Sequence, residues 1–232
     1  MRLDKYLSKM GFGTRNEVKK LIRAQHVFVN DECVIQFDMK IDEDNDVVKV
    51  DDEIVEYEEF HYYMLNKPQD YITSTELSSN SIMNLIYEPY NDLFPCGRLD
   101  KDTEGLLLIT NDGQLSHALL APKNHIEKEY IVECAKELSE EDIKHIEAGD
   151  IAEGGNTFLP AKIFKSGELE YHIIVCEGKY HEIKRIFLAL DNEVLYLKRI
   201  RMKNLVLDET LDLGEYRKLS IEEIEDLKEV LY

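Results

Sequence analysis

A charged tripeptide, Arg98-Leu99-Asp100, comes directly before a segment that the sequence predicts to be a buried strand. The stretch is GRLDKDTEGLLLITNDG, in which an apolar run follows the charges and an Asn-Asp-Gly turn ends the run. A rigid strand that holds an exposed loop is a common way to place a reactive group. A carboxylate in such a loop can attack an electrophilic carbon or stabilise positive charge. The alternative is that Asp100, or its neighbour Asp102, is an ordinary turn or capping residue.

The segments that would position this loop form one α+β unit from about residue 60. Apolar runs predict strands at 61–66, 105–110, 128–134, 157–164, 170–176 and 194–202. Helical spacing predicts helices at 113–121, 139–148, 181–190 and 220–231. Ser139 with Asp142 and Ser220 with Glu223 supply N-terminal caps for two of these helices.

The first 55 or so residues form a separate unit, in which two short helices are followed by short strands. Thr14 and Glu17 match the capping-box pattern that begins the second helix. The segment VFVNDECVI predicts two strands around an Asn30-Asp31 turn, and DEDNDVVKV predicts a turn and a third strand. The acidic stretch DDEIVEYEE, residues 51–59, is the candidate linker to the larger unit.

The charge of the chain is strongly acidic but uneven. Its 48 Asp and Glu residues outweigh 28 Lys and Arg residues, a net charge of −20, which taken alone argues against a nucleic-acid partner. Residues 1–30, however, hold seven basic and two acidic residues, and residues 178–203 hold seven and three. Residues 31–60 hold two and thirteen. A polyanion is therefore expected to meet only the two basic segments, and the acidic residues are expected to form solvated surface.

The basic residues of the first unit lie on and beside its helix pair and could form a phosphate-binding surface. They are Arg2, Lys5, Arg15, Lys19, Lys20 and Arg23. Structured RNA is bound largely through its backbone and shape, so such a surface would give affinity with little sequence choice. A solvated amphipathic helix pair is the alternative.

The sequence speaks against several other classes of protein. No apolar run approaches the ~20 residues of a membrane helix, and the N-terminus does not resemble a signal peptide. The four cysteines lie far apart and none is in a Cys-x-x-Cys pair, which argues against a zinc ribbon or a disulfide framework. We expect a cytoplasmic protein without membrane contact.

The N-terminal stretch RLDKYLSKMGFGTRNEVKKLIRAQHVFVND resembles an S4 RNA-binding domain. The matching positions include Leu3-Asp4, Thr14-Arg15 and Leu21-Ile22. His26 and Asp31 depart from the pattern, because the family usually has glycine at both positions. The resemblance implies a small S4 (αL-like) domain at residues 1–58.

The stretch GRLDKDTEGLLLIT closely resembles the signature of the RsuA-type pseudouridine synthases. Four further segments agree in the family's order, namely MLNKPQDYITST, KEYIVE, EGKYHEIKRIF and LGEYRKLS. The resemblance implies a catalytic domain at residues 59–232 with a mixed, largely antiparallel sheet flanked by helices. It also implies a reaction in which a uridine in RNA becomes pseudouridine, with no cofactor and no metal.

The same resemblance implies roles for the charged site residues. Asp100 matches the family's catalytic aspartate, which would act at the anomeric carbon of the ribose. Lys184 matches a basic position whose charge would keep the aspartate ionised, and Arg185 is the alternative for that role. Addition at the ribose carbon and elimination through a glycal both remain open.

Three further residues complete the expected site. Tyr130 matches the family's active-site tyrosine and would face an extruded base or move a proton, although a core tyrosine is the alternative. Arg98 is expected to enter the RNA helix or bind a phosphate, and otherwise forms a structural ion pair. Ile183 is expected to pack against the extruded uracil, and otherwise belongs to the core.

Three hypotheses for the function remain open. The first is a small-subunit (16S) rRNA pseudouridine synthase, and MLNKPQ and LITNDGQLSH favour it. The second is a sister enzyme that acts on large-subunit (23S) rRNA. The third is an S4-type RNA-binding protein without catalysis, against which the intact set of Asp100, Tyr130 and Lys184 argues. A monomer is the default expectation, and the sequence leaves open both the target uridine and the choice between free RNA and a ribosomal particle.

Overall fold

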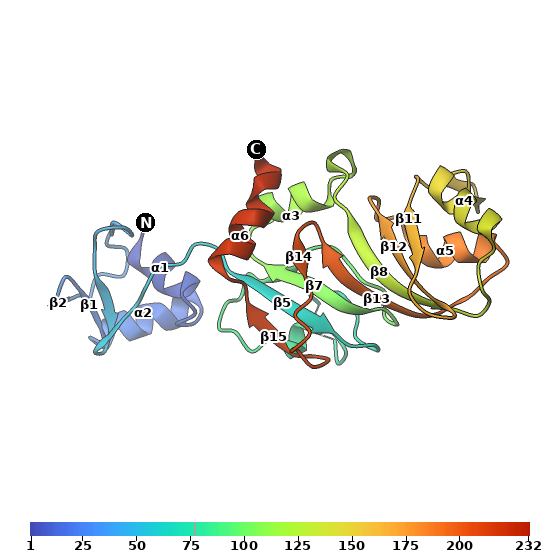
Figure 1. Ribbon diagram of the computed structural model, residues 1–232. Coiled ribbons are helices and arrows are strands. Elements are labelled where there is room, and N and C mark those ends of the chain that lie inside the picture. Colours follow the sequence, from blue (N-terminus) through green and yellow to red (C-terminus); the bar gives the residue numbers. More distant parts are fainter. Residues whose placement is uncertain (77) are drawn as a thin grey trace. The chain divides into compact units, whose positions relative to one another are not determined.

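The computed structural model describes residues 1–76 and 78–232, and the chain divides into two compact units (Figure 1). The first unit contains Met1–His61 together with Tyr87–Leu93. The second unit contains Tyr62–Ile86 and Phe94–Tyr232. No sequence pattern indicated that the short segment Tyr87–Leu93 belongs with the N-terminal residues.

The first unit consists of two helices and a small antiparallel sheet. The elements are α1 (Leu3–Lys9), α2 (Arg15–Arg23), β1 (Val27–Val29), β2 (Glu32–Cys33), β3 (Val48–Val50) and β4 (Glu53–Ile54). The strand order is β2-β1-β3-β4. Thr14 caps α2 as predicted, because its hydroxyl accepts the Glu17 N–H and the Glu17 carboxylate accepts the Thr14 N–H. Asn30 and Asp31 have φ angles of 52° and 67°, as a tight hairpin turn requires.

The candidate linker was predicted wrongly in part. Strand β4 lies inside residues 51–59, and Val55 is buried in the core of the first unit. The many acidic residues hid this strand, because both of its residues, Glu53 and Ile54, are exposed and leave no apolar pattern in the sequence.

The second unit is built on a nine-stranded sheet that is mixed and largely antiparallel. Its main path runs β11-β12-β8-β13-β7-β5-β15, with β14 paired to β13 and β6 paired to β7. The strands are β5 (Tyr62–Lys67), β6 (Phe94–Pro95), β7 (Glu104–Thr110), β8 (Lys128–Cys134), β11 (Lys162–Lys165), β12 (Glu170–Val175), β13 (Val194–Met202), β14 (Leu205–Val206) and β15 (Tyr216–Lys218). The pair β7 and β13 is parallel, and the other neighbouring strands of this sheet are antiparallel.

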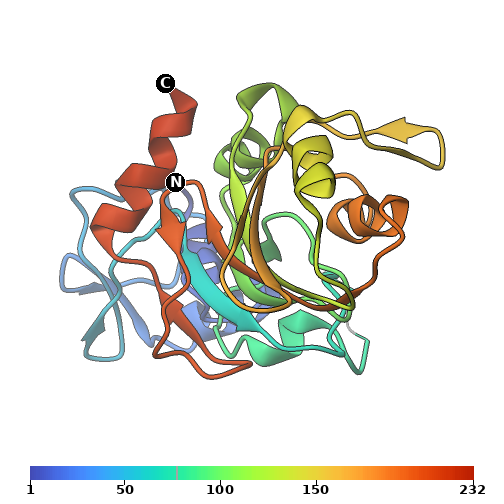
Figure 2. The ribbon, with the colours of Figure 1, turned by 45° about the vertical axis from the view of Figure 1, so that its right-hand side comes forward.

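Helices pack against different parts of this sheet (Figures 1 and 2). They are α3 (Gly113–Leu120), α4 (Glu140–Ala148), α5 (Glu182–Ala189) and α6 (Ile221–Lys228). Leu115 of α3 and Leu227 of α6 share one core cluster with Met64 of β5 and Leu106 of β7. Helix α4 contacts β11, and α5 contacts β13 and the small hairpin of β9 (Ala152–Glu153) and β10 (Asn156–Thr157). Burying each large apolar side chain of this kind stabilises the fold by about 1.5–3 kcal/mol.

Most predicted elements of the second unit occur where the sequence placed them, but the strand at 157–164 was wrong. Strand β10 ends at Thr157 and β11 begins at Lys162. Pro160 between them has no N–H to donate to a strand partner. The Ala161 N–H donates instead to the carbonyl of Ile146 at the end of α4. Tertiary packing against α4 therefore interrupts the strand.

Among the described residues, none of the helices combines the length and the apolar character that a membrane span requires.

Candidate active site

The loop that carries Arg98, Leu99 and Asp100 is held in place by a buried lysine. The Lys67 ammonium, at the end of β5, donates to the carbonyl oxygens of Asp100 at 3.0 Å and Thr103 at 2.8 Å. It also lies 3.0 Å from the carbonyl of Pro68 and 3.4 Å from that of Lys101. Because carbonyl oxygens from both ends of the loop converge on one cation, the backbone around Asp100 is fixed.

A threonine fixes the same loop at Leu99. The Thr73 hydroxyl donates to the Leu99 carbonyl at 2.8 Å and accepts the Leu99 N–H at 3.2 Å. Thr73 and Lys67 both belong to the segment MLNKPQDYITST, for which sequence reasoning found a resemblance but no role. The available signal was a lysine at the end of a largely apolar strand.

Burial lowers the pKa of Lys67 to about 8, and the carboxylates of Asp102 and Asp100 oppose that change. The side chain has no solvent exposure. At neutral pH the ammonium form therefore predominates, which the surrounding carbonyl oxygens favour.

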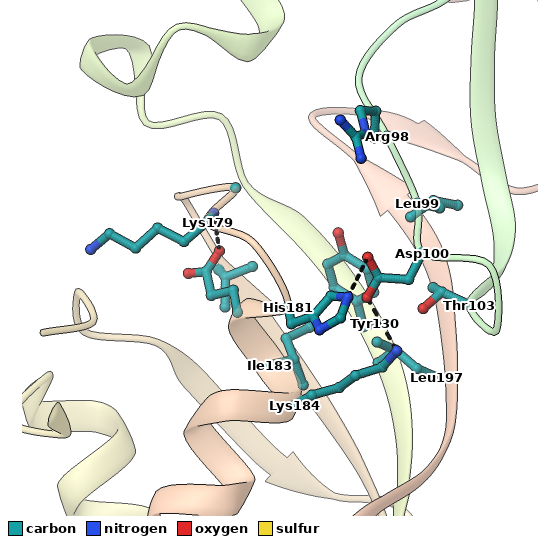
Figure 3. A pocket seen from close by; sticks show the side chains of 13 residues that line it. Arg98, Leu99, Asp100, Thr103, Tyr130, Lys179, His181, Ile183, Lys184 and Leu197 are labelled. Atoms are coloured by element: carbon teal, nitrogen blue, oxygen red, sulfur yellow. Dashed lines mark hydrogen bonds and ion pairs between the residues drawn. The ribbon is translucent and has the colours of Figure 1, made fainter. Parts of the chain in front are cut away.

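Two cationic or potentially cationic groups face the Asp100 carboxylate (Figure 3). Lys184 of α5 lies 3.1 Å from Asp100 Oδ2 and 2.5 Å from Asp102 Oδ1. His181 Nε2 lies 3.5 Å from Asp100 Oδ1. The structure thus brings Lys184 to Asp100 across 84 positions of sequence, together with a histidine that sequence reasoning did not select. The signal available for His181 was its position in the segment EGKYHEIKRIF.

The charges of this cluster reinforce one another. Burial alone would lower the pKa of Lys184, but the hydrogen bonds and charges of Asp102 and Asp100 together raise it. Burial alone would raise the pKa of Asp102, but the hydrogen bond and ion pair with Lys184 lower it. Lys184 therefore remains a cation between two carboxylates.

Arg185, the alternative partner of Asp100, points to other groups. Its Nε lies 2.6 Å from Glu153 Oε2, and its Nη2 donates to the Glu153 carbonyl at 2.7 Å. Its guanidinium also lies 5.4 Å from the centre of the Phe158 ring. Arg185 therefore links α5 to the β9–β10 hairpin.

Tyr130 lies on β8 and lines the same pocket as Asp100. Its exposed fraction is 9%. Burial raises the pKa of Tyr130, and the positive charge and hydrogen bond of Arg199 oppose the rise. Tyr130 is thus a mostly desolvated phenol at the wall of a cavity, which suits both base contact and proton transfer.

The pocket is a cavity of about 80 Å³ between the loop before β7 and the start of α5. Residues 98–100 and 181–184 line two of its sides, and Leu197 of β13 contributes an apolar surface. Ile183 also lines it and is buried. Thr103 lines it too, and its buried hydroxyl has no hydrogen-bond partner among the described residues. The cavity therefore combines apolar walls with charged side chains.

A wider groove of about 510 Å³ adjoins this cavity. Arg98, Asp100 and Lys184 line both spaces, which makes the groove the approach to the cavity. Tyr180 lies in the groove with 71% of its surface exposed and stacks on His181 at 3.7 Å between ring centres. Arg98 is therefore at the entrance, where the sequence predicted contact with RNA.

A buried acid also lines the cavity and was not predicted. Glu182 has an exposed fraction of 7% and accepts the Lys179 N–H at 3.2 Å. Burial, together with repulsion from Glu177, raises the pKa of Glu182 to about 7. The acid is therefore partly protonated at neutral pH.

The predicted basic residues of the first unit occupy three settings. Lys5 and Arg15 line a groove of about 300 Å³ together with Lys9. Lys19 and Arg23 lie 4.9 and 5.3 Å from the centre of the Phe37 ring. Arg2 pairs with Asp4 at 2.8 Å, and Lys20 is exposed. These side chains present cations on the first unit, as phosphate binding would require.

Metal ligation finds no support in the part of the chain that the structure describes, where no three His, Cys, Asp or Glu side chains group around one point. The four cysteines are free.

Comparison with known proteins agrees with this arrangement. Residues 61–189 match the family described as RNA pseudouridylate synthase, and residues 1–54 match the S4 domain. An uncharacterized RNA pseudouridine synthase of Bacillus subtilis (strain 168), YtzG, is 43% identical and is covered over 99% of both proteins. The ribosomal small subunit pseudouridine synthase A of Haemophilus influenzae is 36% identical, with 98% of this chain and 99% of that protein covered.

The corresponding protein of Escherichia coli (strain K12) is 34% identical, with 97% and 98% covered. Among solved structures, a crystal structure of a pseudouridylate synthase is similar with a TM-score of 0.70 and 37% identity. That similarity covers 98% of this chain and 99% of the other.

Proposed function

We propose that this chain, which belongs to the RsuA family of RNA pseudouridine synthases, isomerises a uridine of small-subunit (16S) ribosomal RNA. The relatives from Haemophilus influenzae and Escherichia coli carry the name ribosomal small subunit pseudouridine synthase A and match almost the whole chain. The S4 domain supplies a second contact to RNA. A monomer working in the cytoplasm is part of the same proposal.

Asp100 is the catalytic carboxylate in this proposal. The observation that carries it is the contact of Lys184 with Asp100 Oδ2 at 3.1 Å, at the edge of a cavity that Tyr130 closes. A carboxylate that is ion-paired and held by a fixed backbone can act on the anomeric carbon of the ribose with little reorganisation. It serves equally as a nucleophile or as the group that assists elimination.

The other pocket residues receive the extruded nucleotide. Moving a base out of its stack costs a few kcal/mol, which contacts in a fitted pocket offset. Tyr130, Ile183 and Leu197 supply flat and apolar surfaces for the uracil. Arg98, at the entrance, binds a phosphate beside the extruded nucleotide.

A tritium-release assay with [5-³H]uridine-labelled RNA tests the function directly, because the C5 hydrogen leaves when the new carbon–carbon bond forms. Parallel reactions with 16S RNA, 23S RNA and assembling small-subunit particles identify the substrate. Release from 16S RNA or its particles at one mapped position is the expected result. Release from 23S RNA alone would establish the sister function, and tight binding without release from any substrate would establish a non-catalytic RNA-binding protein.

A further inference from the structure

Arg199 of β13 is a buried cation without a carboxylate partner. Its exposed fraction is 2%, and its Nε donates to the Leu106 carbonyl at 2.8 Å. Its Nη2 has no hydrogen-bond partner among the described residues, and no ion pair joins it to an acid there. Burying a guanidinium without a counter-ion costs several kcal/mol, so a purely structural role explains its presence poorly.

The backbone places Arg199 directly beside the active-site tyrosine. In the antiparallel register of β13 and β8, Arg199 stands opposite Tyr130. On its other side, Arg199 pairs with Gly105 of β7. A Cβ at Gly105, which has a φ of 99°, would lie 2.2 Å from the Arg199 carbonyl oxygen. This glycine lets β7 approach the Arg199 backbone closely.

Charges from three elements act on the Tyr130 phenol. The positive charge of Arg199 of β13 favours negative charge on the phenol oxygen. Glu182 of α5 and Asp100 of the loop before β7 disfavour that charge. Arg199 is the positive group in this set, and it stands on the strand next to β8 in the sheet.

We propose that Arg199 is a positioning residue that orients the Tyr130 hydroxyl and stabilises its oxygen as the phenolate that removes the uracil C5 proton. This inference rests on the proposed function. In that step the C5–H bond breaks and its electron pair forms the C5–C6 double bond, while the pair of the C6–N1 double bond moves to N1. The Tyr130 oxygen, which has lost its own proton to solvent beforehand, takes the C5 proton, and N1, which is no longer bound to the ribose, takes up a proton from solvent.

Arg199→Gln tests this role, because the amide retains donors but loses the charge. The single-turnover rate should fall by about 10²-fold, while the affinity for RNA stays the same because Arg199 is buried. RNA that carries [5-²H]uridine should show a larger isotope effect with the variant than with the parent, because loss of the proton becomes slower. A structural role would not change the isotope effect.

A double-mutant cycle tests whether Arg199 acts through Tyr130. Adding Arg199→Gln to Tyr130→Phe should lower the rate by less than about threefold further, because the group that it assists is already gone. Arg199→Lys, which keeps the charge, should recover part of the rate and serves if the glutamine variant does not fold. Additive losses, or an unchanged isotope effect, would overturn the proposal.

A measurement without RNA separates this inference from the proposed function. In protein labelled with [¹³Cζ]tyrosine, the Tyr130 signal is assigned by its absence in Tyr130→Phe. Its titration should move to higher pH in Arg199→Gln, since the stabilising cation is lost. Arg217→Gln, which removes another arginine of the same sheet, should leave it unchanged. An unmoved Tyr130 titration would refute the role of Arg199 even in an active enzyme, whereas an inactive parent would refute only the proposed function.

Discussion

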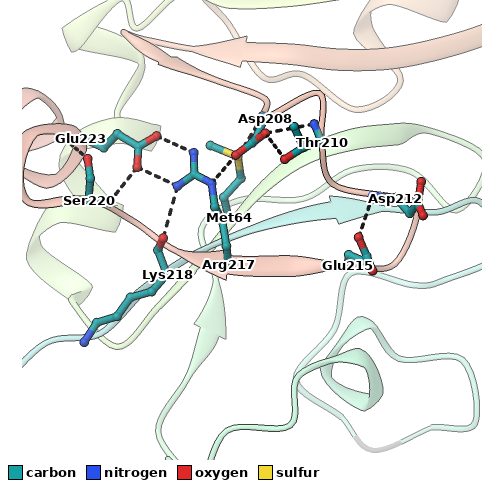
Figure 4. A network of polar contacts seen from close by, with 9 residues as sticks. All are labelled: Met64, Asp208, Thr210, Asp212, Glu215, Arg217, Lys218, Ser220 and Glu223. Atoms are coloured by element: carbon teal, nitrogen blue, oxygen red, sulfur yellow. Dashed lines mark hydrogen bonds and ion pairs between the residues drawn. The ribbon is translucent and has the colours of Figure 1, made fainter.

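Arg217 and Arg199 lie on two strands of the same sheet but in opposite electrostatic surroundings. Arg217 of β15 forms two parallel hydrogen bonds of 2.8 Å with the Glu223 carboxylate, and its Nε lies 2.6 Å from Asp208 Oδ2 (Figure 4). Arg199 donates to the Leu106 carbonyl and stands opposite Tyr130 in the sheet, and among the described residues no carboxylate pairs with it.

In the network around Arg217, each charged group has a partner of opposite charge. The Glu223 hydrogen bond is the largest cause that raises the pKa of Arg217, with burial opposing it and Asp208 adding to it. Hydrogen bonds from Thr210, and then from Arg217, lower the pKa of Asp208 to about 2. Glu223 also caps α6 through the Ser220 N–H. The network therefore ties β15, the loop at Asp208 and α6 together.

The difference indicates that the charged residues of the two regions have different roles. Where each charge has its partner, the charges hold the fold together. In the pocket region, the burial of Arg199 and Glu182 costs free energy of folding that their contacts do not offset. Such unfavourable burial is common among residues with a catalytic role. Changes at Asp100 and Lys184 should therefore affect turnover more than stability, and changes at Arg217 should do the reverse.

Asp100→Asn should have the largest effect. The amide keeps the size of the carboxylate but has neither its charge nor its nucleophilicity, so pseudouridine formation should fall by at least about 10³-fold. RNA affinity and thermal stability should stay close to those of the parent. Tritium release measures the loss. Asp102→Asn, whose side chain is 69% exposed, should keep most activity, and the catalytic assignment would be wrong if the two variants behaved in the opposite way.

Lys184→Met should follow, with a loss of about 10²-fold in turnover and little loss of binding. Without the cation, the negative charges of Asp100 and Asp102 repel each other, which disfavours the ionised form of the catalytic carboxylate. The acid limb of the pH–rate profile should move to higher pH. Lys184→Arg should restore part of the rate, and an unchanged profile for Lys184→Met would remove this lysine from the mechanism.

Arg217→Gln should lower stability by about 1–2 kcal/mol and leave turnover at 25 °C unchanged. About a third of the Arg217 side chain is exposed, so solvent screens part of its ion-pair energy. Thermal unfolding at low and high salt measures the effect, which should shrink at high salt. A loss of turnover with intact stability would contradict the conclusion that the charges around Arg217 stabilise the fold and take no part in turnover.

Glu182→Gln should have an effect of a different kind, a gain in stability that depends on pH. Because the folded state raises the pKa of Glu182 to about 7, this acid's contribution is fully present below its unfolded value near 4.5 and is lost as the pH rises through 7. Glutamine resembles the protonated acid. The variant should match the parent below about pH 4.5 and exceed it by about 3 kcal/mol at pH 8. A difference that is constant with pH would show that Glu182 does not titrate in this range.

Local patterns in the sequence determined much of the fold. The caps at Thr14, Ser139 and Ser220 form as predicted, since a cap needs only residues three positions apart. Strands β8 and β13 have the predicted bounds, because a period of two in apolar residues specifies a strand without knowledge of its partners. The resemblance also singled out Asp100, Tyr130 and Lys184, which the structure brings to one cavity.

Only the tertiary structure decided which charges meet and which are buried alone. Lys67 holds a loop more than 30 positions away, and His181 joins Lys184 at Asp100 from the turn before α5. Arg199 and Arg217 look alike in sequence, since each is an arginine next to a lysine. Their difference comes from desolvation and from partners distant in the chain. Neither is encoded in local spacing, because both depend on how the sheet brings its strands together.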